Sequence, residues 1–321
     1  PGIFNDVIGP VMRGPSSSHT AGAYRIAVIA ASLYGSIPAI LKCTFDPEGS
    51  FAPTYRPLGV DKAICSGLIG LDMLGSDYER STEIADSLVQ VQFAVEPLGP
   101  EQHPNTIRIE MSGKEDLTLW ARSTGGGSIE IFRLNDWDVC ISGRRFEFFI
   151  ESEMNSPCER HLKEVLEECF LAGNIKVKFD YNEDKVLAQC RVYNIDKIDD
   201  LFSKRNDKIC FQDLKSLSGV RCLRFVKPVF HVQKGPPLFR SAAELCTRSQ
   251  EDRRSLGEWG IGYEARFLGI TRAEAAAIMV DRFAVMCRSI DAGLMDSDVK
   301  LAWLSPHASA IMSDFEENKL P

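Results

Sequence analysis

The sequence Gly14-Pro15-Ser16-Ser17-Ser18-His19-Thr20-Ala21-Gly22 runs directly into an alanine-rich apolar stretch that continues to Leu33. Serine or threonine just before such a stretch is typical of a helix N-terminus, and Gly35 suits its C-terminal end. The pattern predicts a helix from Ala21 to Leu33 that begins in a serine-rich turn.

Around this turn, strand and helix patterns predict one mixed α/β domain over residues 1–143. Strand patterns occupy residues 41–45, 106–111, 117–121 and 129–134. A second helix is predicted from Asp61 to Leu74, with Asp61 as its N-cap and Gly75 closing it.

The region 144–230 shows the element order of a small ferredoxin-like module. Strands are predicted at 146–151, 175–181, 185–193 and 220–232, and helices at 156–172 and 195–203. The second and third strands are expected to form a hairpin across Asn182-Glu183-Asp184. The resulting β-α-β-β-α-β order is that of a ferredoxin-like fold.

The segment 231–321 is predicted to turn helical beyond its linker Gly235-Pro236-Pro237. Thr271 and Glu274 form a capping box that opens a helix ending near Gly293. Its apolar residues on one stripe are Ile278, Met279, Phe283, Met286 and Ile290. Because so short a segment has little core of its own, we expect this stripe to contact either a further segment of the same kind of helical part or helices of a partner chain. The fold class is thus α/β (α+β) and multidomain.

The composition excludes some classes of partner. The 321 residues carry a net charge of -8, which argues against a nucleic acid, since phosphate binding needs a basic surface. No apolar run reaches the roughly 18 residues of a membrane span, and no signal-peptide pattern begins the chain. We expect a cytoplasmic protein. The 10 cysteines never occur as Cys-x-x-Cys, which predicts free thiols and no metal site in this chain.

Ser16, Ser17, Ser18, His19 and Thr20 are the strongest candidates for a functional site. A helix start offers free backbone amides and a positive dipole end, which favour an anion such as the carboxylate of a small amino acid. The hydroxyls add donors, and His19 adds a group that titrates near neutral pH. The alternative is an ordinary helix cap beside an exposed histidine.

Two other motifs are candidates for ligand contact. Gly125, Gly126 and Gly127 lie between predicted strands, where glycine lets the backbone approach a ligand closely, although a tight turn explains them equally well. The motif His103-Pro104-Asn105-Thr106 enters a strand, and a structural turn is its alternative interpretation.

Several of these motifs resemble those of the iron–sulfur L-serine dehydratase family, specifically its β domain or subunit. The matching stretches are Gly9–Met12 with Gly14–Gly22, Gly49-Ser50-Phe51-Ala52 with Thr54-Tyr55, Asp61-Lys62-Ala63, His103–Thr106, and Gly125-Gly126-Gly127 with Ile129-Glu130-Ile131. Residues 144–230 resemble the ACT module that follows this domain in two-subunit members. More weakly, Phe239–Leu245 and the helix ending in Ala292-Gly293-Leu294 resemble the start of the family's α part.

The resemblance implies a lyase of amino-acid metabolism and gluconeogenesis that removes water from L-serine with a [4Fe-4S] cluster. It implies that His19 and Ser18 are catalytic. It also implies that the substrate is bound by Ser16, Ser17, Ser18, Thr20, Asp61, Asn105, Gly125, Gly126 and Gly127. The cluster ligands are expected on a cysteine-bearing α-type partner chain or another segment, and the chain is expected to be part of an oligomer.

One stretch departs from the family pattern. Where the family has Gly-His-Gly-Thr-Asp, this chain has Pro57-Leu58-Gly59-Val60-Asp61. An alkyl side chain cannot move protons, so the change predicts an altered substrate. The alternatives are a non-catalytic regulatory subunit whose ACT-like module binds an amino acid, and a related lyase that eliminates a thiol.

Overall fold

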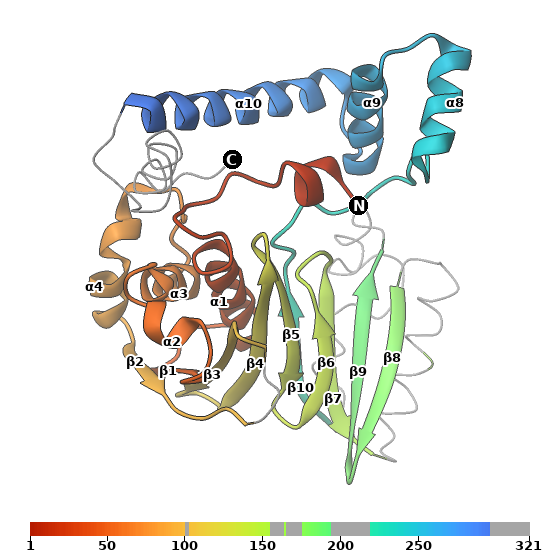
Figure 1. The fold of residues 1–321 in the computed structure, drawn as a ribbon. Coiled ribbons are helices and arrows are strands. Elements are labelled where there is room, and N and C mark those ends of the chain that lie inside the picture. Colours follow the sequence, from red (N-terminus) through yellow and green to blue (C-terminus); the bar gives the residue numbers. More distant parts are fainter. Residues whose placement is uncertain (100–102, 155–163, 165–174, 194–218, 296–321) are drawn as a thin grey trace.

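In a computed structural model of the chain, the described residues are 1–99, 103–154, 164, 175–193 and 219–295. Two sheets lie side by side beneath a layer of helices formed by the C-terminal part of the chain (Figure 1). This arrangement confirms the predicted mixture of helices and sheets in a multidomain α/β protein.

The first sheet has six strands in the order β2-β1-β3-β4-β5-β6. They are β1 (Ile40–Phe45), β2 (Gln90–Val95), β3 (Thr106–Ser112), β4 (Leu117–Gly125), β5 (Ser128–Leu134) and β6 (Trp137–Ile141). Only β1 and β2 pair in parallel, and every other neighbouring pair is antiparallel. Side chains along β4 alternate between buried and half-buried, so one face packs against the core, as period-two patterns predict.

Helices cover the inner face of this sheet. They are α1 (Ala21–Tyr34), α2 (Phe51–Thr54), α3 (Val60–Ile69), the 3-10 turn η2 (Ser76–Arg80) and α4 (Ser81–Asp86). The prediction of α1 is confirmed, with Gly35 in a left-handed conformation at its C-terminus. Helix α3 approaches α1 closely at Gly67, where a Cβ atom would lie 2.5 Å from the Tyr24 carbonyl oxygen.

The predicted ends of α3 are wrong at both termini. Left-handed Gly59 precedes its first residue and left-handed Gly70 follows its last, so Asp61 lies inside the first turn and does not cap it. The helix begins at Val60 because the left-handed backbone of Gly59 cannot be part of a right-handed helix. The turn at Gly70 ends the helix before the predicted stop at Gly75 is reached.

The second sheet has the order β10-β7-β9-β8, with all neighbouring strands antiparallel. Its strands are β7 (Glu147–Glu153), β8 (Ile175–Asn182), β9 (Lys185–Val192) and β10 (Val220–Val226). The first and third strands are central, as a ferredoxin-like module requires, and the β8–β9 hairpin is confirmed. Strand β10 ends well before the predicted residue 232. The helices predicted at 156–172 and 195–203 lie, apart from Glu164, outside the described residues.

The helical layer contains α8 (Ala242–Asp252), α9 (Leu256–Leu268) and α10 (Arg272–Met295), above the π-helical turn η1 (Ile3–Val7) (Figure 1). The capping box before α10 is confirmed: the Thr271 amide donates to the Glu274 carboxylate at 2.8 Å, and the Glu274 amide donates to the Thr271 hydroxyl at 3.2 Å. Among the helices of the described ranges, none is long and apolar enough to span a membrane.

The predicted apolar stripe of α10 is divided between two environments. Ile278 and Met279 pack against a small core formed by Phe4, Tyr263, Phe267 and Leu268. The remaining stripe residues, Phe283, Met286 and Ile290, are exposed. The helical layer therefore has a small core of its own. One of its aromatic side chains, Phe4, comes from the N-terminal segment.

Candidate functional site

The serine-rich turn enters α1 as a helical turn. The Thr20 amide donates to the Ser16 carbonyl at 2.8 Å, and Thr20 itself has right-handed helical dihedral angles. Its hydroxyl lies within hydrogen-bond distance of the carbonyls of Arg13 and Ser16, to either of which it can donate, and it makes no capping bond to α1. The prediction that side chains of Ser16 to Thr20 cap α1 is therefore wrong for Thr20, because a chain that is already helical turns this hydroxyl back onto preceding carbonyls.

The imidazole of His19 is at the centre of the turn. Its Nδ1 lies 2.9 Å from the Ser16 hydroxyl and 3.1 Å from the Ser18 hydroxyl. The edge of the ring meets Phe51 at a centroid distance of 5.2 Å. Burial lowers the pKa of His19 below its usual 6.5, although a hydrogen bond from the ring to the backbone of Ser50 opposes the shift. The ring is therefore neutral at neutral pH and offers one bare nitrogen.

Two other motifs reach His19 from distant parts of the sequence. The Ser50 hydroxyl lies 3.4 Å from His19 Nε2 and donates to Oδ1 of Asn105. The backbone amide of Ser50 donates to the Pro104 carbonyl at 2.8 Å. A Cβ atom on Gly49 would lie 2.7 Å from that same carbonyl oxygen, so only glycine allows the two loops to approach this closely.

The motif around Asn105 forms a turn and also contacts the residues around His19. The Asn105 amide nitrogen donates to His103 Nδ1 at 3.1 Å, which shapes the turn into β3. The side chain of Asn105 then reaches Ser50 and, through Nδ2, the Ser123 carbonyl at 3.4 Å on β4. The structural turn is therefore confirmed, and the contact of Asn105 with a ligand stays a prediction.

The glycine run is not joined to His19 by any contact in the described ranges. All three glycines have positive φ, so each needs the freedom of glycine. Gly125 and Gly126 are exposed with open space beside them, whereas Gly127 is buried and its carbonyl accepts from Arg25 at 2.6 Å. Gly127 therefore packs inside the protein, and only Gly125 and Gly126 of this run are accessible to solvent.

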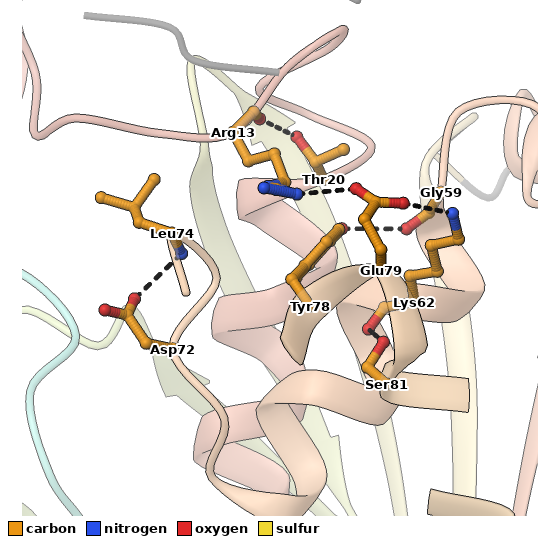
Figure 2. A network of polar contacts seen from close by, with 9 residues as sticks. All are labelled: Arg13, Thr20, Gly59, Lys62, Asp72, Leu74, Tyr78, Glu79 and Ser81. Carbon is orange, nitrogen blue, oxygen red and sulfur yellow. Dashed lines mark hydrogen bonds and ion pairs between the residues drawn. The ribbon is translucent and has the colours of Figure 1, made fainter. Parts of the chain in front are cut away.

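Asp61 belongs to a neighbouring region. Its carboxylate accepts from the Lys62 amide at 2.8 Å, and burial raises its pKa. Beside it, Glu79 pairs with Arg13 at 2.7 Å and with Lys62 at 2.6 Å, while the Tyr78 hydroxyl donates to the Gly59 carbonyl (Figure 2).

The polar network of Arg13, Lys62 and Glu79 contacts the serine-rich turn through Arg13. The Arg13 guanidinium lies 4.4 Å from the centroid of the Tyr78 ring, and the Arg13 carbonyl accepts the Thr20 hydroxyl (Figure 2). Hydrogen bonds from Lys62 and Arg13 lower the pKa of Glu79, which keeps it ionised between them. The network therefore holds residue 13, and with it the entry to the turn, against α3 and η2.

Part of this chain is similar in sequence to curated proteins. No family model matches the chain. Over 140 residues it is 45% identical to the "Probable L-serine dehydratase, beta chain" of Bacillus subtilis (strain 168), covering 43% of this chain and 62% of that relative. Over 150 residues it is 36% identical to the "L-serine dehydratase, beta chain" of Peptoniphilus asaccharolyticus, covering 46% and 66%.

This chain is related to the L-serine dehydratase family. It spans less than two thirds of the length of either curated relative. The residues that converge at His19 come from motifs that resemble this family, namely the serine-rich turn, the Gly49–Ala52 stretch and the His103–Thr106 turn.

Positions 58 and 60, which depart from the serine dehydratase pattern, differ in their burial. Val60 has no exposed surface and belongs to the hydrophobic core, so its side chain does not face a substrate. Leu58 is half-buried and, unlike Val60, keeps exposed surface.

Sequence reasoning missed one member of the site. Ser50 lies in a stretch that resembles the serine dehydratase pattern, yet its residue type alone gave no reason to single it out. The signal was its place beside Gly49, because a glycine followed by a hydroxyl residue in a loop allows the close approach that brings Ser50 to Asn105.

Proposed function

We propose that this chain forms the substrate-binding part of an L-serine-dehydratase-type lyase. The observation that carries the proposal is the convergence of Ser16, Ser18 and Ser50 on a single neutral imidazole, His19, with Asn105 bonded to Ser50 behind it. A β-elimination from an amino acid needs a base for the α-proton and donors for the carboxylate. Both kinds of group are present within this one cluster.

In this proposal each residue of the chain has a limited task. The bare nitrogen of His19 accepts a proton, directly or through the hydroxyl that now contacts it. The Ser16 and Ser18 hydroxyls hold the carboxylate of the amino acid when it enters, as charge-assisted donors. Phe51, fully buried against the ring edge, keeps that side of the imidazole dry.

The family resemblance implies a [4Fe-4S] cluster, which would supply a Lewis-acidic iron for the departing hydroxyl. The described residues do not fit as its ligands: they contain no group of three or more His, Cys, Asp or Glu side chains that could hold a metal ion. Cys43, Cys65 and Cys190 are buried in the two sheets and their helices. We therefore assign the cluster to a cysteine-bearing partner chain or to another segment, and no step here runs through it.

The exposed side of α10 is the surface we propose for that partner chain. Val280, Phe283 and Ile290 are 65%, 62% and 48% exposed and follow one another at helical spacing on this side. Large apolar side chains at this density are characteristic of the centre of an interface.

The proposal is tested by purifying the chain together with any co-encoded cysteine-bearing chain, under anaerobic conditions. We expect iron and pyruvate release from L-serine in the complex and neither in the isolated chain. His19→Gln should abolish release while leaving iron content unchanged. A complex that binds an amino acid without turnover would support the regulatory alternative, and release of a thiol product would support the thiol-eliminating one.

The partner surface has its own matched pair of variants. Phe283→Glu should weaken association with the partner chain at least tenfold, because it places a charge in an apolar contact. Arg288→Glu, an exposed change on the same helix, should leave association within about twofold. Sedimentation velocity of the mixed chains measures both, and equal association of the two variants would contradict the assignment of this side of α10.

A further inference from the structure

We infer that Asn105 and Ser50 are positioning residues that fix the tautomer of His19, with the proton on Nε2 and the lone pair on Nδ1. The inference deepens the proposed function, since it says which nitrogen of the candidate base is available. It rests on three successive hydrogen bonds whose directions leave no choice at each step.

The first step is the orientation of the Asn105 amide. Its Nδ2 lies 3.4 Å from the Ser123 carbonyl oxygen, which can only accept a hydrogen bond. The Ser123 amide also donates to the Asn105 carbonyl at 3.1 Å, which anchors the residue between the turn and β4. The donor end of the side chain therefore faces Ser123, and the acceptor end, Oδ1, faces Ser50.

The second step is the direction of the Ser50 hydroxyl. Because Oδ1 carries no hydrogen, Ser50 must donate to it. A hydroxyl has a single proton, so toward any other neighbour the Ser50 oxygen can only accept. Its backbone, held by the Pro104 carbonyl, keeps the hydroxyl in this position.

The third step assigns the proton on the imidazole. His19 Nε2 faces the Ser50 oxygen at 3.4 Å, and a favourable contact there requires an N–H on Nε2. In a neutral ring the other nitrogen, Nδ1, is then bare, and it accepts from the Ser16 or Ser18 hydroxyl at 2.9 or 3.1 Å. The opposite tautomer would set the lone pair of Nε2 against the lone pairs of Ser50.

The consequence is a base whose lone pair already faces the side where the proposed substrate enters. Nδ1 points toward the hydroxyls of Ser16 and Ser18, and it can take a proton once the hydroxyl that donates to it has turned to the substrate carboxylate. Ser50 and Asn105 touch no substrate in this scheme. They act through His19, in the way that a third group orients the base in nucleophile–base pairs.

The test uses the full chain labelled with ¹⁵N in histidine. Signals of His19 are assigned by their loss in His19→Gln. We expect a protected N–H signal at Nε2 and the downfield position of a bare nitrogen at Nδ1. Ser50→Ala should remove the protected signal and shift the titration midpoint of His19 to lower pH, because the ring loses an acceptor for its proton.

A second pair of variants separates positioning from general damage. Asn105→Asp keeps the acceptor for Ser50 and adds a negative charge, so the His19 midpoint should shift to higher pH, opposite to Ser50→Ala. Ser50→Thr keeps the hydroxyl and should restore the wild-type spectrum. Circular dichroism monitors folding in every variant.

Two results would overturn the inference: an N–H on Nδ1 in the wild-type chain, or midpoints that move in the same direction in Ser50→Ala and Asn105→Asp. These readouts need neither a partner nor turnover. If they come out as expected and the complex still releases no pyruvate, the proposed function fails and the tautomer assignment stands.

Discussion

Arg282 on α10 donates a hydrogen bond to the carbonyl of Phe4 at 2.9 Å, and its guanidinium lies 4.3 Å from the centroid of the Phe4 ring. The same side chain reaches the carbonyl of Gly9, and the carboxylate of Glu264 on α9 accepts the amides of Ile3 and Phe4. Arg282 and Glu264 are 5% and 1% exposed. Two buried charges from the C-terminal helices thus hold the N-terminal segment that leads into the serine-rich turn.

Removing this contact should destabilise the whole chain. Arg282→Met preserves the length of the side chain but leaves the carbonyl of Phe4 without its donor, which costs about 1–3 kcal/mol. Urea unfolding followed by circular dichroism measures the loss. Arg288→Met, an exposed change on the same helix, is the control and should be close to neutral. Similar midpoints for the two variants would show that the clamp contributes nothing.

The same contact makes stability depend on pH through His231. Its Nε2 lies 3.1 Å from Nη2 of Arg282, which can only donate, so this nitrogen must be bare. Burial, and then the charge of Arg282, lower the pKa of His231 below 6.5, while Glu264 opposes the shift. As the pH falls, the unfolded chain therefore binds this proton before the folded chain does. The stabilisation that neutral His231 contributes is complete above pH 6.5 and is lost as the pH falls below that value.

We expect the free energy of unfolding to fall between about pH 7 and about pH 5 by more in the wild type than in His231→Gln. Glutamine retains an acceptor for Arg282 but cannot titrate. His19, whose pKa is also lowered, and Asp61 and Glu147, whose pKa values burial raises, are common to both proteins and cancel in the difference. Parallel curves for the two proteins would contradict the prediction.

Gly22, in the first turn of α1, should not tolerate a side chain. A Cβ atom there would lie 2.4 Å from the hydroxyl oxygen of Ser123, a completely buried residue of β4. Overpacking of this kind costs roughly 1–3 kcal/mol, so Gly22→Ala should lower the urea midpoint.

Two further variants make the Gly22 prediction specific. Adding Ser123→Gly should recover part of the loss, because it removes the atoms that clash. Gly257→Ala on α9, where the nearest atom is 4.0 Å away, should be neutral or stabilising by up to about 1 kcal/mol. Equal losses from Gly22→Ala and Gly257→Ala would mean that the close approach does not matter.

Restoring the family residue at position 60 should harm the protein. Val60→Thr keeps the volume but places a hydroxyl in a fully buried apolar site, at a cost of about 1–3 kcal/mol. Thermal unfolding of this variant and of Val60→Ala separates the polar effect from the effect of lost volume. Unchanged stability together with faster pyruvate release from the complex would show that this position faces the substrate after all.

Much of the local structure could be predicted from the sequence. Helix α1, the β8–β9 hairpin and the capping box before α10 follow from periodicity and from residues such as Gly35 and Glu274, whose preferences act over a few neighbouring positions. His19 and Asn105 could be named as candidates for the same reason, because both stand in short motifs with unusual composition.

The tertiary structure alone decided which distant groups meet. Ser50 comes within reach of His19 only because its loop passes over the turn at residues 103–106, and Val60 points into the core only because α3 packs on α1. In the same way, Glu264 and Arg282 look in the sequence like ordinary charged residues on the surface of a helix. They are buried because their partners are backbone groups more than 250 residues away. A local pattern records the preference of a residue, whereas burial of a charge depends on a partner that only the folded chain brings to it.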